Sequence, residues 1–313
     1  ALTATVPAIV LGRRGDATEF ILPLAVRQRA GWRELTFLGR DLGDYNAPLL
    51  AFDFEKRHTN FKALWVDIQF LLQANRRYRH DVVFFDKMPE RVGAQANPLL
   101  QLPVSRHPSS AYLAHLTDDW DTFYAARRSS ATRRRDRSKR KRLAEHGVIR
   151  LVTPAAPDDR LRTTETLIEQ KRRAFARMGV PDLFARPGYR AFFREVATNP
   201  RLRPLVHVSE LQVGEITAAA NLGLRLRDVY YHVLASYDDG PLARFGPGAA
   251  HLRELLRHAI EQGCTIFDFT VGDEPYKRDW CDTELKLYDH VAAASARGLA
   301  AAVAIAAARA AKR

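Results

Sequence analysis

The sequence predicts an α/β (α+β) protein of two similar lobes, each a mixed, mostly antiparallel sheet flanked by helices. Two observations predict this fold. One order of elements occurs twice, with three strands separated by turns, a Gly-rich loop, a helix and a further strand. The length of 313 residues suits two hydrophobic cores better than one.

Alternating apolar residues predict the strands of the first lobe, which takes residues 1–116. The expected strands are 7–12, 19–26, 34–38 and 81–86. A loop rich in Gly, Asp, Asn and Pro covers 39–48, and apolar residues at helical spacing predict a helix over 55–74. Because strand character begins close to Ala1, we expect a further element of this lobe upstream of it.

The second lobe has its core at residues 201–290. Its expected strands are 204–210, 216–226, 229–237 and 264–269. A Gly/Pro loop at 240–248 leads into the clearest helix of the chain, 248–262, which Gly263 ends. An Ala-rich helix is expected over 291–313, packed on this lobe or solvated.

A helical connection, residues 117–200, links the lobes. Its expected helices are 118–145, 158–178 and 187–198, which prolines separate. We expect this connection to pack with the second lobe.

Most of the net charge of +13 comes from one segment. Arg127–Arg142 contains ten basic residues and one acidic residue, with almost no apolar residue to form a buried face. The segment is either a solvated charged helix or a binding surface for an anion. The candidate partners are tRNA or another nucleic acid, an anionic lipid surface, a phosphorylated or polysaccharide acceptor, and a cyclic dinucleotide. Its expected anion contacts are Arg133, Arg134 and Arg135.

Cysteine content and hydropathy limit where the protein is expected to be located and which metal or disulfide chemistry is expected of it. The two cysteines are too few for a disulfide scaffold, and no apolar run reaches the roughly 18 residues needed to cross a bilayer. We expect a cytoplasmic protein, with a peripheral place at the inner membrane as an option. Cys264 and Cys281 lack metal-ligand spacing and His partners, so we expect no metal.

The loop before the 248–262 helix carries the first chemical signal. Gly246 and Gly248 allow close approach of the backbone to a ligand, and Pro247 suits the first position of a helix. The N–H groups and dipole of a helix start favour an anion such as a pyrophosphate. The alternative is an ordinary strand-to-helix turn.

Several strings resemble the FemAB-like branch of the GNAT acyltransferase superfamily. They are Val229-Tyr-Tyr-His, Ser236-Tyr-Asp-Asp, Pro247-Gly248, Phe267–Trp280 and, in the first lobe, Phe37–Leu49. Members of this group are often found near bacterial exopolysaccharide and cellulose synthesis genes. The resemblance implies two GNAT-like lobes and an acyl thioester bound where the third and fourth strands of the second lobe separate.

The resemblance also implies a donor site for acetyl-CoA or another acyl-CoA. Backbone groups near Leu234 and Ala235 would hold the pantetheine arm. Ala243 stands where the family has Arg or Gln, and Arg244 follows it. The donor contacts that the resemblance implies are Leu234, Ala235, Arg244, Gly246, Gly248 and Ala249.

The string after the last core strand supplies the catalytic candidates. In many GNAT enzymes a tyrosine at this place protonates the leaving thiolate, and Tyr276 matches it; the alternative is a packed ring with a solvated hydroxyl. Asp273 and Glu274 are possible bases or caps of the turn. Lys277 is either a contact for an anionic group of the acceptor or a solvated surface lysine.

Acceptor recognition from across the lobe interface is expected at Asp44 and Tyr45, in the long loop of the first lobe. The alternative is an Asx-type turn with a tyrosine over it. The favoured function is transfer of an acyl group, to nitrogen or to oxygen, from acyl-CoA to an amino sugar or another cell-envelope or exopolysaccharide precursor. The alternatives are a FemAB-type aminoacyl-tRNA-dependent transferase and a cyclic-dinucleotide-binding effector that uses the Arg-rich segment.

Overall fold

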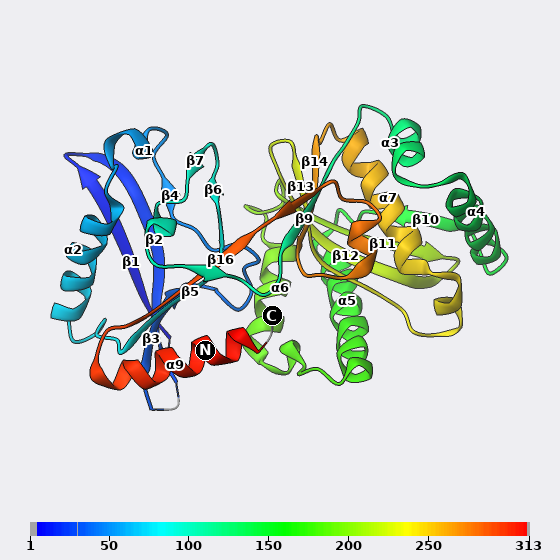
Figure 1. The fold of residues 1–313 in the computed structure, drawn as a ribbon. Helices are drawn as coiled ribbons and strands as arrows, with labels where there is room; N and C mark the ends of the chain where they lie inside the picture. The colour runs from blue at the N-terminus through cyan, green and yellow to red at the C-terminus, as the bar shows by residue number, and fades with distance from the viewer. Residues whose placement is uncertain (1–4, 30, 312–313) are drawn as a thin grey trace. The chain divides into compact units, whose positions relative to one another are not determined.

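The computed structural model describes residues 5–29 and 31–311, and Figure 1 shows their fold. The chain forms two compact units. Unit 1 holds the residues up to Ala111, Val271–Asp273 and the residues from Glu284 onward, and unit 2 holds Tyr112–Thr270 and Glu274–Thr283. Both are α/β, as the order of elements predicted.

Unit 1 is built on a sheet whose main strand order is β1-β2-β3-β5-β16-β8. These strands are β1 Thr5–Arg14, β2 Ala17–Gln28, β3 Arg33–Phe37, β5 Val82–Pro89, β16 Leu287–Ala293 and β8 Ser105–Arg106, with β4 Leu49–Leu50 paired to β2. Neighbouring strands are antiparallel except β3 and β5, which run parallel. The core joins apolar residues of β2 and β5 to one face of α2 Phe61–Ala74.

The helix predicted over 55–74 is divided into α1 Phe54–Arg57 and α2. Asn60 causes the division because its side chain accepts a hydrogen bond from the Ala63 N–H and caps a new helix start. The short strands β6 Arg91–Val92 and β7 Gln95–Ala96 form a separate two-stranded sheet.

Unit 2 is built on a sheet of order β10-β11-β12-β13-β14-β9-β15. These strands are β10 Ile149–Val152, β11 Val206–Val213, β12 Ile216–Leu226, β13 Val229–Tyr237, β14 Ile266–Val271, β9 Ala111–His115 and β15 Thr283–Leu285. The helices are α3 Trp120–Arg127, α4 Ser130–Ala144, α5 Pro157–Met178, α6 Pro187–Thr198, α7 Pro247–Glu261 and α8 Pro275–Arg278. Helices α5 and α7 pack on the central strands β11, β12 and β13.

The predicted boundaries differ from these units at the C-terminal end. The sequence placed 201–290 in the second lobe and a helix over 291–313 on it or in solvent. In the structure β16 pairs antiparallel with β5, from Leu287↔Pro89 to Ala293↔Val82, and α9 Ala296–Ala310 contacts both strands. Figure 1 draws α9 in red beside the blue and cyan strands of unit 1. Residues 312–313 of the predicted helix lie outside the described residues.

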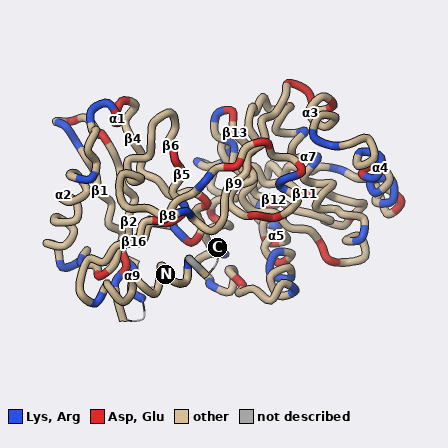
Figure 2. The backbone as a smooth tube through the Cα atoms, in the orientation of Figure 1, with Lys and Arg blue, Asp and Glu red and all other residues tan. Residues whose placement is uncertain are grey.

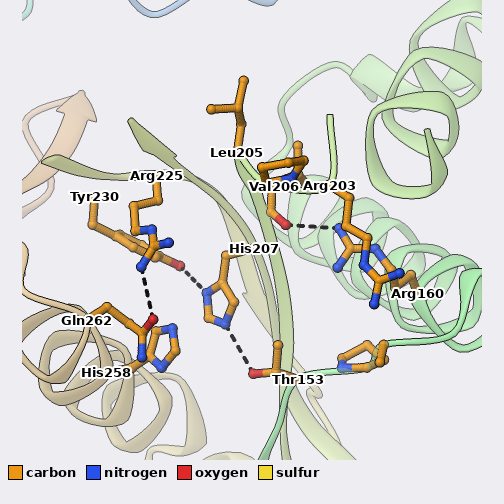
Figure 3. A pocket seen from close by; sticks show the side chains of 13 residues that line it. Thr153, Arg160, Arg203, Leu205, Val206, His207, Arg225, Tyr230, His258 and Gln262 are labelled. Atoms are coloured by element: carbon orange, nitrogen blue, oxygen red, sulfur yellow. Dashed lines mark hydrogen bonds between the residues drawn. The ribbon is translucent and has the colours of Figure 1, made fainter. Parts of the chain in front are cut away.

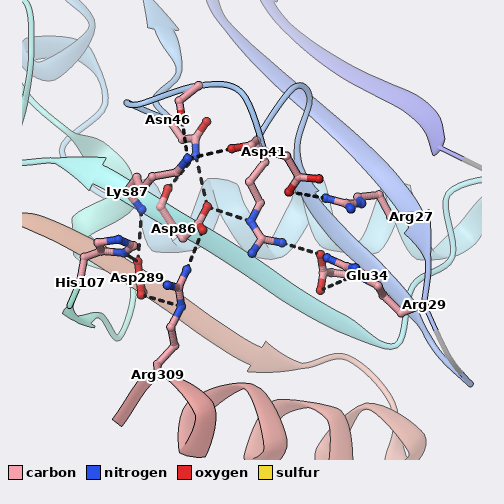
Figure 4. Close-up of polar contacts among 12 residues, drawn as sticks. Arg27, Arg29, Glu34, Asp41, Asn46, Asp86, Lys87, His107, Asp289 and Arg309 are labelled. Carbon is pink, nitrogen blue, oxygen red and sulfur yellow. Dashed lines mark hydrogen bonds and ion pairs between the residues drawn. The ribbon is translucent and has the colours of Figure 1, made fainter. Parts of the chain in front are cut away.

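A buried ionic network explains this return of the chain to unit 1 (Figure 4). Arg309 of α9 pairs with Asp86 of β5 at 2.7 Å and with Asp289 of β16 at 3.4 Å. Asp289 also accepts a hydrogen bond of 2.7 Å from the His107 ring, and Asp86 pairs with Arg40 at 3.0 Å. Because Asp86 and Asp289 are almost completely buried, the cations that pair with them fix the C-terminal strand and helix on this sheet.

Candidate active site

The sheet of unit 2 opens between β13 and β14. The two strands pair in parallel only over Val229–Tyr231 and Ile266–Asp268. Strand β13 continues to Tyr237 and stays paired with β12 to its end. From residue 232 onward, the β14-facing edge of β13 therefore offers backbone N–H and C=O groups to a ligand.

A β-bulge lies at the point where the strands part. Leu222 of β12 faces Leu234 and Leu224 faces Tyr231, so β13 carries one extra residue between these positions. A bulge bends its strand and increases the local twist. This bend turns β13 away from β14 and places Leu234 and Ala235, the predicted pantetheine contacts, in the open part of the strand.

The loop that follows β13 ends in an electropositive helix start. Gly246 has a φ of 69°, the left-handed conformation that glycine tolerates, and α7 begins at Pro247. The N–H groups of Gly248 and Ala249 belong to the first turn, which has no carbonyl partner earlier in the helix. The Lys139 ammonium of α4 lies 3.7 Å from the position that a Cβ on Gly246 would take. A helix start beside an ammonium group is suited to an anion.

Two other residues of this loop region explain its local shape. A Cβ on Gly248 would lie 3.0 Å from the Tyr237 ring, so glycine lets the helix start pack on the end of β13. Arg244 is exposed, and its guanidinium lies 4.8 Å from the centre of the Phe245 ring. Its charge is therefore available on the surface of the loop.

Lys277 of α8 is buried beside the open strands, with 2% of its surface exposed. Its ammonium donates to the Thr270 carbonyl oxygen at 3.2 Å and pairs with Glu274 at 2.9 Å. The alternative of a solvated surface lysine does not describe this position. A buried ammonium with one carboxylate partner is a strong local field for charge that develops nearby.

Thr270 holds a strained conformation next to Lys277. Its φ is 59°, which a β-branched residue rarely adopts. The Asp268 carboxylate accepts its N–H at 2.7 Å, and its carbonyl accepts the Lys277 ammonium. Backbone strain of this kind concentrates at functional sites, where surrounding bonds maintain it. Here it directs a carbonyl toward the buried lysine.

Lys171 of α5 is a site residue that the sequence analysis did not identify. Its ammonium donates to the carbonyl oxygen of Ala235 at 3.3 Å, on the open strand. Burial lowers the pKa of Lys171, the Glu274 carboxylate raises it, and the Lys277 charge lowers it further. The sequence signal that could have identified Lys171 is its spacing in the helix. It continues the buried face of α5 that Leu167 and Ile168 form.

Tyr276 lies in α8, the short helix after the last core strand. Its ring packs at 6.3 Å from Phe269, and 41% of its surface is exposed. Burial of the hydroxyl and the Glu274 carboxylate raise the pKa of Tyr276, so the phenol keeps its proton at neutral pH. A protonated phenol at this place can donate a hydrogen bond to a leaving thiolate.

The remaining predicted residues are distributed over both units. Asp273 accepts a hydrogen bond from the Ser110 N–H at 3.4 Å within unit 1, while Glu274 belongs to unit 2. Asp44 and Tyr45 are half-buried in the unit 1 loop. Nearby, burial lowers the pKa of the half-buried Lys87, and the Asp86 and Asp44 carboxylates oppose this shift. Asp44, Tyr45 and Asp273 therefore belong to unit 1, and their roles in the site stay predictions.

The Arg-rich segment forms α4, and the blue segments of Figure 2 gather over it. The expected helix over 118–145 is divided here, because Ser129 caps a new helix by accepting the Thr132 N–H. One side of α4 is anchored: Asp136 pairs with Arg253 of α7 at 3.2 Å and Arg140 pairs with Glu254 at 2.6 Å. A polar pocket of about 460 Å³ lies between α3, α4 and α7.

The three predicted anion contacts on α4 differ in exposure. Arg133 is half-buried and donates to the carbonyl oxygens of Ala125 and Arg128, both at 3.1 Å. Arg134 and Arg135 are exposed. Of the three predicted contacts, Arg134 and Arg135 are therefore the ones exposed to a partner.

Within residues 5–29 and 31–311, no group of three or more His, Cys, Asp or Glu side chains is arranged to hold a metal ion. Over the same ranges, none of the helices has the length and apolar character that a membrane span requires.

The comparisons with known proteins place this geometry in a family. The family described as an acetyltransferase (GNAT) domain matches residues 130–278, which run from α4 to α8. No curated protein matches the sequence.

The fold is similar to solved structures of low sequence identity. FemX is 10% identical with a TM-score of 0.60, covering 92% of this chain and 89% of FemX. The C-terminal domain of a putative lysylphosphatidylglycerol synthetase from Agrobacterium fabrum is 11% identical with a TM-score of 0.56, covering 94% and 87%. A tandem GNAT protein from the clavulanic acid biosynthesis pathway is 14% identical with a TM-score of 0.50, covering 94% and 86%. Residues 130–278 therefore match an acetyltransferase (GNAT) domain, and the chain has the GNAT-superfamily, FemAB-like fold of these structures.

Proposed function

We propose that the protein transfers an acyl group from acyl-CoA to the amine of an amino sugar in a cell-envelope or exopolysaccharide precursor. The observation that carries the proposal is the separation of β13 from β14, with the Gly246 loop at one end and Lys277 beside it. In this proposal the pantetheine arm pairs with the open edge of β13, and the pyrophosphate lies at the start of α7 near Lys139.

The reaction needs one new C–N bond and the loss of one C–S bond. The neutral amine attacks the thioester carbonyl, the C–S bond breaks, and the amine loses a proton while the CoA thiolate takes one up. Tyr276 donates to the thiolate sulfur, and Glu274 accepts the proton of the amine, directly or through water. The Lys171 and Lys277 ammonium groups stabilise negative charge that develops at the carbonyl oxygen.

The ammonium of Lys171 gives this proposal a specific feature. It bonds to the Ala235 carbonyl, one of the backbone groups assigned to the pantetheine arm. A donor amide that bonds to this oxygen either shares it with Lys171, since a carbonyl oxygen accepts two hydrogen bonds, or displaces the ammonium, which is then free to turn toward the thioester. A lysine whose pKa burial has lowered makes such a change at a smaller desolvation cost.

The second candidate function is transfer of an amino acid from aminoacyl-tRNA, which the FemAB-like resemblance implies. The observation in its favour is the contact of α4 with the loop before α7. Lys139, close to Gly246, belongs to the same basic helix as the exposed Arg134 and Arg135. A nucleic acid lying along α4 would therefore bring its acylated end toward the open strands.

Product analysis separates the two functions. The protein is incubated with glucosamine and [¹⁴C]acetyl-CoA in one reaction and with glucosamine and [¹⁴C]alanyl-tRNA in another, and products are identified by mass spectrometry. We expect N-acetylation from acetyl-CoA only. Labelled product from the tRNA alone would replace the acyl-CoA function with the second candidate. The absence of product with both donors, repeated with UDP-glucosamine and with chitosan oligosaccharides, would reject the amino-sugar acceptor.

A further inference from the structure

A second polar pocket lies in unit 2 at the opposite end of β13 from the open strands (Figure 3). It encloses about 270 Å³. Its wall includes Tyr230, the second residue of β13, whereas the acyl site uses the strand from residue 232 onward. The rest of the wall comes from the segment after β10, from α5, from the start of β11 and the residues before it, from the end of β12 and from the C-terminal end of α7.

Three arginines line this pocket without an acidic partner among the described residues. Arg160 is 5% exposed, and its guanidinium donates to the carbonyl oxygens of Ala197 at 2.6 Å and Val206 at 3.0 Å. Arg225 donates to the side-chain oxygen of Gln262 at 2.9 Å. Arg203 is exposed, and its charge lowers the pKa of Arg160. Buried arginine charge is normally paired, so the missing counter-charge is the notable feature.

Hydrogen bonds fix which atoms the pocket presents to a ligand. The Asn221 amide nitrogen can only donate, so the Tyr230 hydroxyl accepts from it at 2.9 Å and gives its own proton to His207 Nδ1 at 2.8 Å. His207 therefore carries its proton on Nε2 and donates to the Thr153 hydroxyl at 3.2 Å. The Thr153 hydroxyl that accepts this bond also lines the pocket.

The histidines of the pocket are neutral, so its positive charge does not depend on them. His207 and His258 stack with their ring centres 4.3 Å apart. Burial and the charges of His258, Arg160 and Arg225 lower the pKa of His207 to about 3. Burial also lowers the pKa of His258, which the Glu261 carboxylate opposes. The groups available to a ligand are thus hydrogen-bond donors and permanently charged arginines.

We propose that this pocket binds a phosphate group, as inorganic phosphate or as the phosphate of a small monoester. Arg160 and Arg203 lie on one side of the His207 ring and Arg225 on the other, and Thr153 lies at its Nε2 atom (Figure 3). A tetrahedral oxyanion has acceptor oxygens on several sides, so one phosphate can accept from more than one of these donors. The volume holds a phosphate with a few waters or a small ester group, since one water occupies about 30 Å³.

Calorimetry with the whole protein tests this site, with inorganic phosphate and glycerol 3-phosphate as probes and chloride at matched ionic strength as the background. We expect saturable binding and a melting temperature that rises with probe concentration. The double variant Arg203→Gln/Arg225→Gln should bind at least about tenfold more weakly, because each arginine supplies charge-assisted hydrogen bonds. Thr153→Val should weaken binding by a smaller factor.

The matched control is Arg201→Gln, an exposed arginine two residues from Arg203 that does not line the pocket. It removes the same kind of charge and should leave the affinity unchanged. Tighter binding of glycerol 3-phosphate than of phosphate would assign the site to a monoester, and the reverse order would assign it to the free ion. The proposal is overturned if neither probe binds, or if the double variant, folded by circular dichroism, binds both as the parent protein does.

Discussion

Lys277 and Tyr276 are neighbours in α8 whose environments assign them different tasks. The Lys277 ammonium is fixed by the Thr270 carbonyl and Glu274, so it acts as a positioned charge. Tyr276 is partly exposed to solvent, and its phenol is protonated at neutral pH, as that of a tyrosine ordinarily is. These two side chains carry the proposed chemistry, and each can be replaced by a side chain of similar volume that lacks the functional group.

Replacing Tyr276 with Phe should lower kcat and leave donor affinity nearly unchanged. The phenol proton stabilises the leaving thiolate only as the C–S bond breaks, and a positioned acid is worth about 10²–10⁴ in rate. Steady-state kinetics with the acceptor from the product assay measures kcat, and calorimetry measures the donor Kd. A kcat within threefold of the parent, about the effect of a packing change, would remove Tyr276 from the chemistry.

Replacing Lys277 with Met should lower kcat about tenfold to hundredfold and leave the acceptor KM nearly unchanged, because the ammonium stabilises charge that develops only in the transition state. The variant should also lose about 1–3 kcal/mol of stability, since the Thr270 carbonyl loses its donor. Arg278→Met is the control, because Arg278 is the next residue and is exposed. Equal kcat values in the two variants would leave Lys277 with a structural role only.

At the scale of elements, α9 packs closely against the rest of unit 1. Gly298 lies in its first turn, where a Cβ would overlap the carbonyl oxygen of Asp81. That oxygen also accepts the Ala294 N–H at 2.7 Å, so it cannot move without loss of a bond. The helix therefore requires glycine at this position for space.

We expect Gly298→Ala to destabilise the protein by about 1–3 kcal/mol, although alanine is the better helix former. Leu299→Ala, at an exposed position in the same helix, should change stability by less than about 0.5 kcal/mol. Denaturant unfolding followed by circular dichroism measures both. A Gly298→Ala protein as stable as the parent would mean that α9 does not pack on Asp81 as described.

The sequence predicted most of these elements, because apolar periodicity and Gly or Pro punctuation are local signals. Strand β13, the Gly246 loop and α7 were expected at their observed positions. The bulge in β13 was not, since it depends on the register with β12 and no residue marks it. Lys171 was missed for a related reason: its role depends on contact with Ala235, far along the chain.

At the scale of the whole molecule, ionic contacts between residues far apart in the sequence fix where the C-terminal helix and α4 pack, which the sequence alone does not predict. The sequence suggested that the C-terminal helix packs on the second lobe, but Arg309 has its partners at Asp86 and Asp289 in unit 1. The sequence also did not predict which side of α4 is anchored, because that depends on contacts with residues far along the chain. Its apolar residues are few, and its partners Arg253 and Glu254 lie on α7.

Three buried histidines should make unit 2 sensitive to acid. Burial lowers the pKa of His207, His232 and His251 to about 3 each, while an unfolded histidine titrates near 6.5. Between these values the unfolded chain binds more protons. Their contribution to stability is therefore complete above about pH 6.5 and is lost as the pH falls, by about 1.4 kcal/mol per pH unit for each histidine.

Urea unfolding at pH 7, 6 and 5, followed by tryptophan fluorescence, measures this dependence. Below pH 6.5 the free energy of unfolding should fall more steeply as the pH decreases. His251→Gln should reduce this slope by the amount that corresponds to about one bound proton. A free energy that does not change between pH 7 and pH 5 would contradict the neutral, buried state of these rings.

The central claim is that unit 2 binds an acyl-CoA at the open strands with its phosphates at the start of α7. The most direct test is calorimetric titration of acetyl-CoA into the parent protein, Lys139→Glu and the matched variant Arg135→Glu. We predict saturable binding to the parent, a loss of about tenfold or more in Lys139→Glu, and less than threefold in Arg135→Glu. No binding of acetyl-CoA to the parent, or equal affinities in Lys139→Glu and Arg135→Glu, would contradict the claim.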